Sequence, residues 1–203
     1  HKTRAMLDGQ IHDIDEVVKT IKEIKRELEF KLKCDLNDIC IAAAGRVLKT
    51  VVVETSNSYD HDKVFAEEDI HALEMLAVEK AYSDIQSQYE NEKQGFYCVG
   101  YSVVYYTLNN YRITNILGHR GNLIGIKVIA TFLPIEVIED LYTAVEKAGL
   151  NVVNLTLEPI AAMNVAIPKS FRLLNIALVD VGAGTSDICI TKDGSVIGYG
   201  MIP

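Results

Sequence analysis

Three stretches of the chain place apolar residues at helical spacing. In residues 14–33 the apolar side chains recur on one face of a helix, at Ile14, Val17, Val18, Ile21, Ile24, Leu28 and Leu32. Asp13 and Glu16 at the start of this run have the spacing of a capping box. The same periodicity predicts a second helix from Glu67 and a third over residues 135–148, with Gly149 as a left-handed cap.

Between these helices, apolar and polar residues alternate as they do in strands. In residues 96–108 the alternation puts one row on a single face, namely Tyr97, Val99, Tyr101, Val103 and Tyr105, and residues 122–132 repeat the pattern. Apolar runs also predict strands at residues 39–44, 51–53 and 151–155, whereas residues 57–62 and 109–121 have the composition of loops. Residues 175–199, which follow a short helix opening at Glu158, predict a β-meander.

Residues 45–150 therefore follow the order strand, helix, strand, strand, helix, which makes a self-contained α+β unit. A helix and a strand precede this unit, and a strand, a helix and the meander follow it. We expect residues 1–44 and 151–203 to pair as one α/β domain into which residues 45–150 are inserted.

Composition narrows the class of protein. The net charge of −8 and the pI near 5.1 argue against a nucleic-acid partner, because phosphate neutralisation needs clustered cations. The cysteines Cys34, Cys40, Cys98 and Cys189 lie beside aliphatic residues, without a CxxC motif, and predict buried thiols in a reducing compartment. We expect a cytoplasmic protein, since no apolar run is long enough for a membrane helix. The start at His1 and the strand-like run before Pro203 lead us to expect an internal fragment.

A glycine-rich segment interrupts the meander. Gly182, Ala183, Gly184 and Thr185 lie between two strand-like runs, so their backbone N–H groups can form a nest for phosphate. Glycine at positions 182 and 184 allows positive φ and close approach of a ligand. Asp180 ends the preceding strand, where its carboxylate can hold a hydrated Mg²⁺. The GxG triplet by itself is more typical of a plain β-hairpin than of a phosphate loop.

The longer string, Asp-Val-Gly-Ala-Gly-Thr-Ser-Asp-Ile from Asp180 to Ile188, resembles the phosphate-2 motif of the actin, chaperone and sugar-kinase superfamily. This resemblance implies ATP and Mg²⁺ as ligands, with Asp180 as the metal-binding residue. It implies that the residues contacting the phosphates are Gly182, Ala183, Gly184, Thr185 and Asp187. The role of Asp187 stays open between binding and structure. Ala183 stands where the motif commonly has glycine. The resulting Gly-Ala sequence is similar to the one in the pilus-assembly protein PilM.

A second motif supplies a candidate catalytic residue. Glu158-Pro159-Ile160-Ala161-Ala162 resembles the Glu-Pro-x-Ala-Ala sequence of actin-like filaments and chaperones, in which the acid positions the attacking water. A carboxylate beside Pro159 in the first helical turn is also a good cap, and both roles remain open for Glu158.

Within the superfamily, the wider resemblance is to the FtsA family. It covers nearly the whole chain, including the segment from Asp8 to Ile11, the Ala44-Gly45 junction and the segment from Glu146 to Leu150. The fold it implies is an actin-like (ribonuclease H-like) ATPase subdomain 1A, partly formed by residues 1–44 and 151–203, with a strand-helix-strand-strand-helix (SHS2-type) 1C subdomain inserted at residues 45–150. The superfamily's phosphate-1 hairpin and adenosine-site glycines have no counterpart in this chain.

The resemblance implies a cell-division protein that binds Mg-ATP and polymerises or recruits partners through the inserted subdomain. It implies a place at the inner face of the cell membrane, reached through segments outside this chain. Weak ATPase activity is expected of the full-length protein at most, and none of the fragment. The alternatives are a PilM-like scaffold for pilus or secretion assembly, in which hydrolysis is irrelevant, and a chaperone-type ATPase, which is disfavoured because the insertion does not resemble the heat-shock family.

Overall fold

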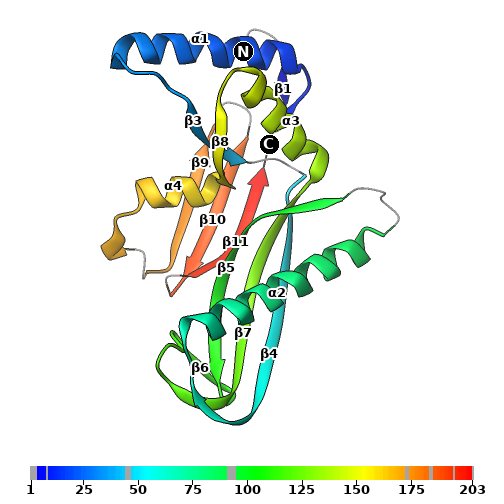
Figure 1. Cartoon of the computed structure of the whole chain (residues 1–203), viewed down its shortest axis with the longest axis vertical. Coiled ribbons are helices and arrows are strands. Elements are labelled where there is room, and N and C mark those ends of the chain that lie inside the picture. The colour runs from blue at the N-terminus through cyan, green and yellow to red at the C-terminus, as the bar shows by residue number, and fades with distance from the viewer. Residues whose placement is uncertain are drawn as a thin grey trace.

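A computed structural model describes residues 4–7, 9–43, 47–90, 95–171, 174–182, 185–193 and 195–202, with only the backbone of Lys169. Figure 1 shows a long antiparallel sheet at one end, two helices at the other, and a second antiparallel sheet beside them. Asp8 and the Ala44-Gly45 junction lie outside the described residues.

The predicted helices are present. α1 (Ile14–Leu32) begins where the Glu16 N–H donates to Asp13 Oδ1 at 3.1 Å, and it ends at Lys33 with φ 56°. α2 (Glu67–Gln88) buries Leu73, Ala77, Ala81 and Ile85 along one face. α3 (Ile135–Lys147) follows Pro134 directly, and Gly149 has the predicted positive φ of 78°. Helical periodicity and capping chemistry therefore located all three.

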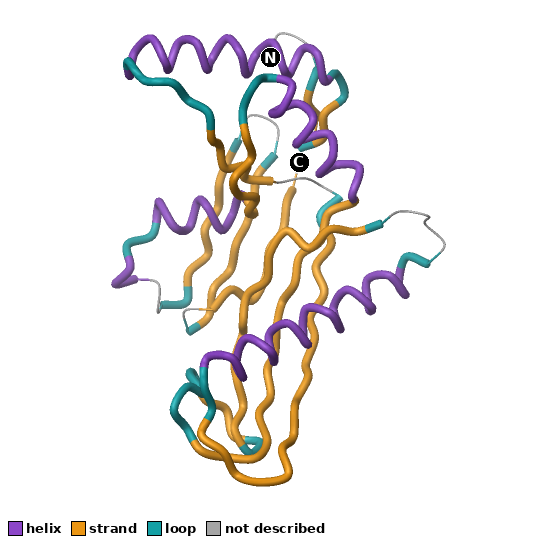
Figure 2. The backbone as a smooth tube through the Cα atoms, viewed as in Figure 1, coloured by secondary structure: helices purple, strands orange, loops and turns teal. Residues whose placement is uncertain are grey.

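The long sheet has the strand order β4-β7-β5-β6 and is antiparallel throughout. Its strands are β4 (Lys49–Val64), β5 (Phe96–Leu108), β6 (Tyr111–Ile113) and β7 (Arg120–Pro134). α2 covers one face, as Figure 2 shows, and the shared core includes Val51, Val53, Phe65, Leu73, Ile85, Ile126, Val128 and Phe132. We call the opposite side, which carries Val52, Glu54, Tyr105 and Lys127, the open face.

One strand prediction and two loop predictions need correction, and the first concerns β5. The expected row from Tyr97 to Tyr105 does not share one face, because β5 shifts register between Cys98 and Gly100 and again between Val103 and Tyr105. Each irregularity adds a residue and reverses the alternation. Tyr101, Val103 and Tyr106 consequently pack against the core under α2, whereas Tyr105 lies on the open face.

The two segments predicted as loops also contain strand. β4 continues through its polar residues to Val64, with a register shift between Ser58 and Lys63, and β6 lies within residues 109–121. Polar composition misled the prediction because these residues form the exposed end of the sheet, where strand side chains meet water.

The remaining elements form smaller layers. β1 (Met6–Leu7) and β2 (Gln10–Ile11) make a hairpin, and β3 (Asp38–Ala43) pairs in parallel with β8 (Asn151–Leu157). α4 (Glu158–Ala166) and a 3₁₀ turn (Lys169–Phe171) lead to β9 (Ile176–Val181), β10 (Ser186–Lys192) and β11 (Ser195–Ile202). These last strands form the predicted meander, an antiparallel sheet of order β11-β10-β9.

α3 joins the flanking segments to each other. Val17 and Val18 of α1 pack with Ala144 and Ala148, and Val145 packs with Ile41 of β3. The last helix of the predicted middle unit therefore packs against elements outside that unit, while Ile138 packs with Val99 and Leu133 inside it. The boundaries at residues 44/45 and 150/151 stay a prediction.

The cysteine prediction was partly wrong. Cys189 is buried and Cys98 is partly buried, but Cys34 and Cys40 are exposed. Cys34 follows the end of α1 and in fact stands between Lys33 and Asp35, which are not aliphatic. Cys40 has aliphatic neighbours, but it alternates with the buried Ile41 on β3 and therefore points the other way.

Candidate functional site

The glycine-rich turn joins β9 to β10. The Gly182 N–H donates to the carbonyl of Thr185 at 2.9 Å and closes the turn. A Cβ at position 182 would lie 3.0 Å from that same carbonyl oxygen, so glycine is required for close approach. The expected positive φ is not found at Gly182. Ala183 and Gly184, both predicted to contact phosphate, lie outside the described residues.

Two predicted site residues face each other beside the turn. Asp180 on β9 is the register partner of Asp187 on β10, and antiparallel partners project to the same face of a sheet. Burial, followed by the nearby charge of Asp180, raises the pKa of Asp187 above its ordinary value. Two carboxylates so placed favour a cation between or beside them.

Glu158 adds a third carboxylate. Burial, then the charge of Asp187 and then that of Asp180, raises the pKa of Glu158. The residue is the first of α4, whose N-cap is Leu157 and which has no side-chain cap hydrogen bond, while Pro159 occupies the first turn. Glu158 is thus not the N-cap residue of α4, but its carboxylate stands in the first turn. The packing of the chain places its carboxylate near the two aspartates, whose negative charges help to raise its pKa.

A hollow of about 350 Å³ adjoins this acidic group. Pro159 and Asp187 form its wall on the side of the turn, and the long sheet and β11 supply the rest, namely Leu48, Thr50, Tyr199, Gly200 and Met201. The Tyr199 hydroxyl lies 3.3 Å from Ser102 Oγ of the open face, and burial raises the pKa of Tyr199 to about 12. The sequence analysis did not single out Tyr199, because this residue belongs to no recognised motif.

The carboxylates suit a metal that keeps most of its own water. No group of three or more His, Cys, Asp or Glu side chains within the described part of the chain could hold a metal by itself. Mg²⁺ commonly binds through one or two carboxylates, with water and phosphate oxygens as its other ligands. The facing aspartates therefore fit a magnesium-phosphate ligand better than a bare ion.

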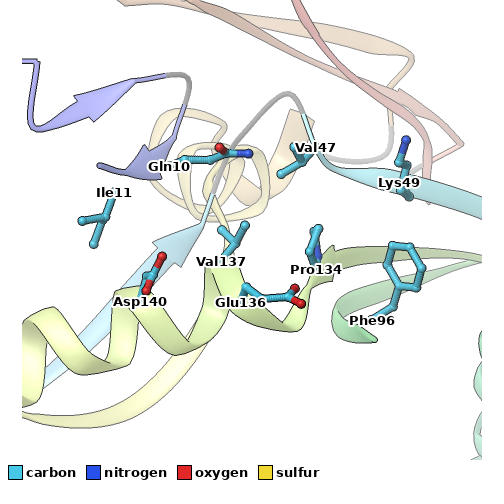
Figure 3. A pocket seen from close by; sticks show the side chains of 9 residues that line it. All are labelled: Gln10, Ile11, Val47, Lys49, Phe96, Pro134, Glu136, Val137 and Asp140. Carbon is cyan, nitrogen blue, oxygen red and sulfur yellow. The ribbon is translucent and has the colours of Figure 1, made fainter. Parts of the chain in front are cut away.

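A second hollow, of about 270 Å³, lies at the junction of β2, α3 and the long sheet. Figure 3 shows Glu136 and Asp140 of α3 on one side, with Phe96 and Pro134 beside them and Lys49 opposite. The complete lining is Gln10, Ile11, Val47, Lys49, Phe96, Pro134, Glu136, Val137 and Asp140. The sequence did not predict this groove, since its residues come from four separate segments.

The mixed α/β fold is similar to that of an actin-like protein. A chain of the solved PilM-PilN type IV pilus biogenesis complex matches with a TM-score of 0.65 and 12% identity, over 98% of this chain and 51% of its own. In sequence, the chain is similar to the cell-division protein FtsA. FtsA of Escherichia coli K12 is 22% identical over 201 residues, which cover 99% of this chain and 46% of that protein.

FtsA of Bacillus subtilis 168 is 31% identical over 67 residues, or 33% of this chain and 15% of its own length. No family model matches the chain. The resemblance to FtsA is thus confirmed along the entire sequence, and the chain spans about half the length of the curated relatives it matches. No helix within the described ranges is both long and apolar enough to span a membrane.

Proposed function

We propose that this chain forms one wall of a Mg-ATP site in an actin-like cell-division protein of the FtsA kind. The observation that carries the proposal is the meeting of Glu158, Asp180 and Asp187 beside a tight glycine turn. Nearby negative charge contributes to the raised pKa of Glu158 and of Asp187, and a bound cation would relieve that repulsion.

Each residue has a distinct part in the proposed site. Asp180 would hold Mg²⁺, with Asp187 facing it from the neighbouring strand, and the ion would offset the negative charge of the phosphates. The backbone from Gly182 to Thr185, with Ala183 and Gly184 between them, and the Thr185 hydroxyl bind the phosphates. Glu158 would orient the attacking water in a full-length protein, whose ATPase activity we expect to be weak.

Nucleotide binding by a full-length protein that contains this chain tests the proposal. We expect Asp180→Ala to weaken Mg-ATP binding at least tenfold, or about 1.4 kcal/mol, and Glu158→Ala to spare binding while reducing turnover. Asp193→Ala, in the hairpin that joins β10 to β11, is the matched control. If neither Asp180→Ala nor Glu158→Ala changes binding or turnover, the ATP site is not where we propose.

The inserted residues 45–150 are proposed to mediate polymerisation or partner recruitment at the division site, with the protein at the inner face of the membrane through segments outside this chain. Filament formation by a full-length protein lacking residues 45–150 tests this role. Unchanged filaments would rule out a polymerisation role for the insertion.

A scaffold that captures a partner, with little or no ATPase activity, is the second candidate function. The groove of Figure 3 favours it, because two carboxylates one helical turn apart border an apolar floor. Such a groove suits a peptide with a basic residue among apolar ones. Undetectable turnover in the parent protein, together with loss of partner capture in Asp140→Lys, would favour the scaffold over the ATPase.

A further inference from the structure

β4 is an edge strand with a long free side. It pairs with β7 along one side, and no other described residue pairs with it. Figure 1 shows β4 at the border of the long sheet, with α2 crossing one face. An edge strand of this length offers unpaired N–H and C=O groups to another strand.

One hydrogen bond shows which backbone groups point outward. Lys80 Nζ of α2 donates to the carbonyl oxygen of Glu54 at 2.7 Å, so this carbonyl is turned away from β7. In an antiparallel pair the two backbone groups of a residue point the same way, and the direction alternates along the strand. Thr50 and Val52 therefore share the outward direction of Glu54.

The segment around Val52 is self-complementary. It reads Thr50-Val51-Val52-Val53-Glu54, so a two-fold axis through Val52 relates valine to valine and threonine to glutamate. Val51 and Val53 are buried beneath α2, whereas the Val52 side chain is 53% exposed on the open face. We propose that two copies of this chain pair in antiparallel fashion through β4, with Val52 opposite the partner's Val52.

The side chains on the open face support this register. Glu54 Oε1 already accepts from Tyr105 at 2.8 Å and lies 2.8 Å from Lys127 Nζ. Lys127 thus offsets the carboxylate charge, and Glu54 Oε2 is left to accept from the hydroxyl of the partner's Thr50. Because valine meets valine at the axis, the centre of the contact brings no like charges together.

Apolar side chains are exposed on both faces of the sheet near this edge. Leu76 lies one helical turn before Lys80 on α2 and is 40% exposed. An added strand covers apolar surface near Leu76 on one face and at Val52 on the other. Lys80 gives up one exposed hydrogen bond, whereas the strands gain a ladder of them.

This inference rests on the self-association in the proposed function, to which it gives a defined surface. It involves none of the residues assigned to Mg-ATP. Failure of the β4 contact and failure of the nucleotide site can therefore be told apart by measuring both in the same variants.

Site-specific cross-linking of the full chain tests the register. In a background with Cys34→Ser and Cys40→Ser, Val52→Cys is treated with a short bifunctional thiol reagent. We expect a covalent dimer, because the two Val52 positions lie directly opposite. Ser56→Cys is the matched control, since at about 3.4 Å per residue its two copies would stand about 27 Å apart.

The association itself is measured by sedimentation equilibrium. We expect the parent chain to dimerise, Val52→Lys to weaken the association at least tenfold through facing cations, and Val52→Thr to keep it. A parent chain that stays monomeric, equal cross-linking at Ser56→Cys, or unchanged dimers in a folded Val52→Lys variant would each overturn the proposal. Mg-ATP binding of Val52→Lys should equal that of the parent.

Discussion

Asp180 of β9 stands directly opposite Asp187 of β10, so two like charges share one face of an antiparallel pair. Their repulsion destabilises the chain when no cation is bound. We therefore expect Asp187→Asn to increase the free energy of unfolding by roughly 0.2–1 kcal/mol at neutral pH without divalent ions. Urea denaturation measures the change.

Glu79→Gln is the control for that measurement, because Glu79 is an exposed carboxylate on α2. It should leave stability unchanged. In a full-length protein, addition of Mg-ATP should make the parent more stable than Asp187→Asn, since the ligand needs the charge that the variant lacks. A variant with no gain in stability would mean that the repulsion is already relieved by water.

The raised pKa of Glu158 makes stability depend on pH. The folded chain keeps this proton at pH values where the unfolded chain has lost it, so folding is favoured by protonation. The contribution of Glu158 to the free energy of unfolding should therefore fall as pH rises from 4.5, its ordinary pKa, towards its higher pKa in the folded chain. Above that higher pKa the loss of stability is complete.

Glu158→Gln should remove this part of the slope, and unfolding free energies between about pH 4 and about pH 7 measure it. Glu79→Gln again serves as the control, with a slope like that of the parent. A steeper slope in Glu158→Gln would contradict the assigned direction of the pKa shift.

The absence of a side chain at Gly182 leaves room for the carbonyl oxygen of Thr185. Gly182→Ala places a Cβ 3.0 Å from that oxygen and forces the turn to widen, which weakens the 2.9 Å hydrogen bond that closes it. We expect a loss of about 1 kcal/mol of stability and weaker Mg-ATP binding in a full-length protein. Gly198→Ala, where no atom lies within 4 Å of the new Cβ, should change neither quantity.

Gly125 in the centre of the long sheet should tolerate no side chain. A Cβ there would lie 2.4 Å from Thr107 Oγ1 and 3.4 Å from the Thr55 carbonyl. We expect Gly125→Ala to cost about 1–3 kcal/mol of unfolding free energy. Gly100→Ala on the neighbouring strand meets Ile160 and Leu157 at ordinary contact distances of 3.7 and 3.8 Å, and should be nearly neutral in the same assay.

Local patterns predicted much of the secondary structure. The cap at Asp13, the face of α2 that buries Leu73 and the left-handed Gly149 each depend on residues close to one another in the chain. Sequence motifs named the residues of the proposed site, but they did not show how these residues lie relative to one another. Asp180, Asp187 and Glu158 were named from motifs, and their mutual approach depends on strand register and on the position of α4.

Other features of the structure could not be predicted from the local sequence pattern. Tyr105 lies on the opposite face from Tyr101 because of a register shift against β7, which no alternation within β5 reveals. The groove of Figure 3 gathers residues from β2, β4, β5 and α3. The order of elements assigns α3 to the inserted unit, and the helix packs both against Val99 and Leu133 of the long sheet and against α1 and β3.

The sequence by itself determined where the helices lie, that residues 175–199 form a meander, and that a glycine-rich segment lies between two of its strands. These features follow from periodicity and turn chemistry within a few neighbouring residues. Only the tertiary structure decided that Asp180 faces Asp187, that Glu158 joins them, and that β4 keeps a free edge centred on Val52. Register and edge exposure arise from pairing between distant segments, and that pairing is set by the packing of the whole chain.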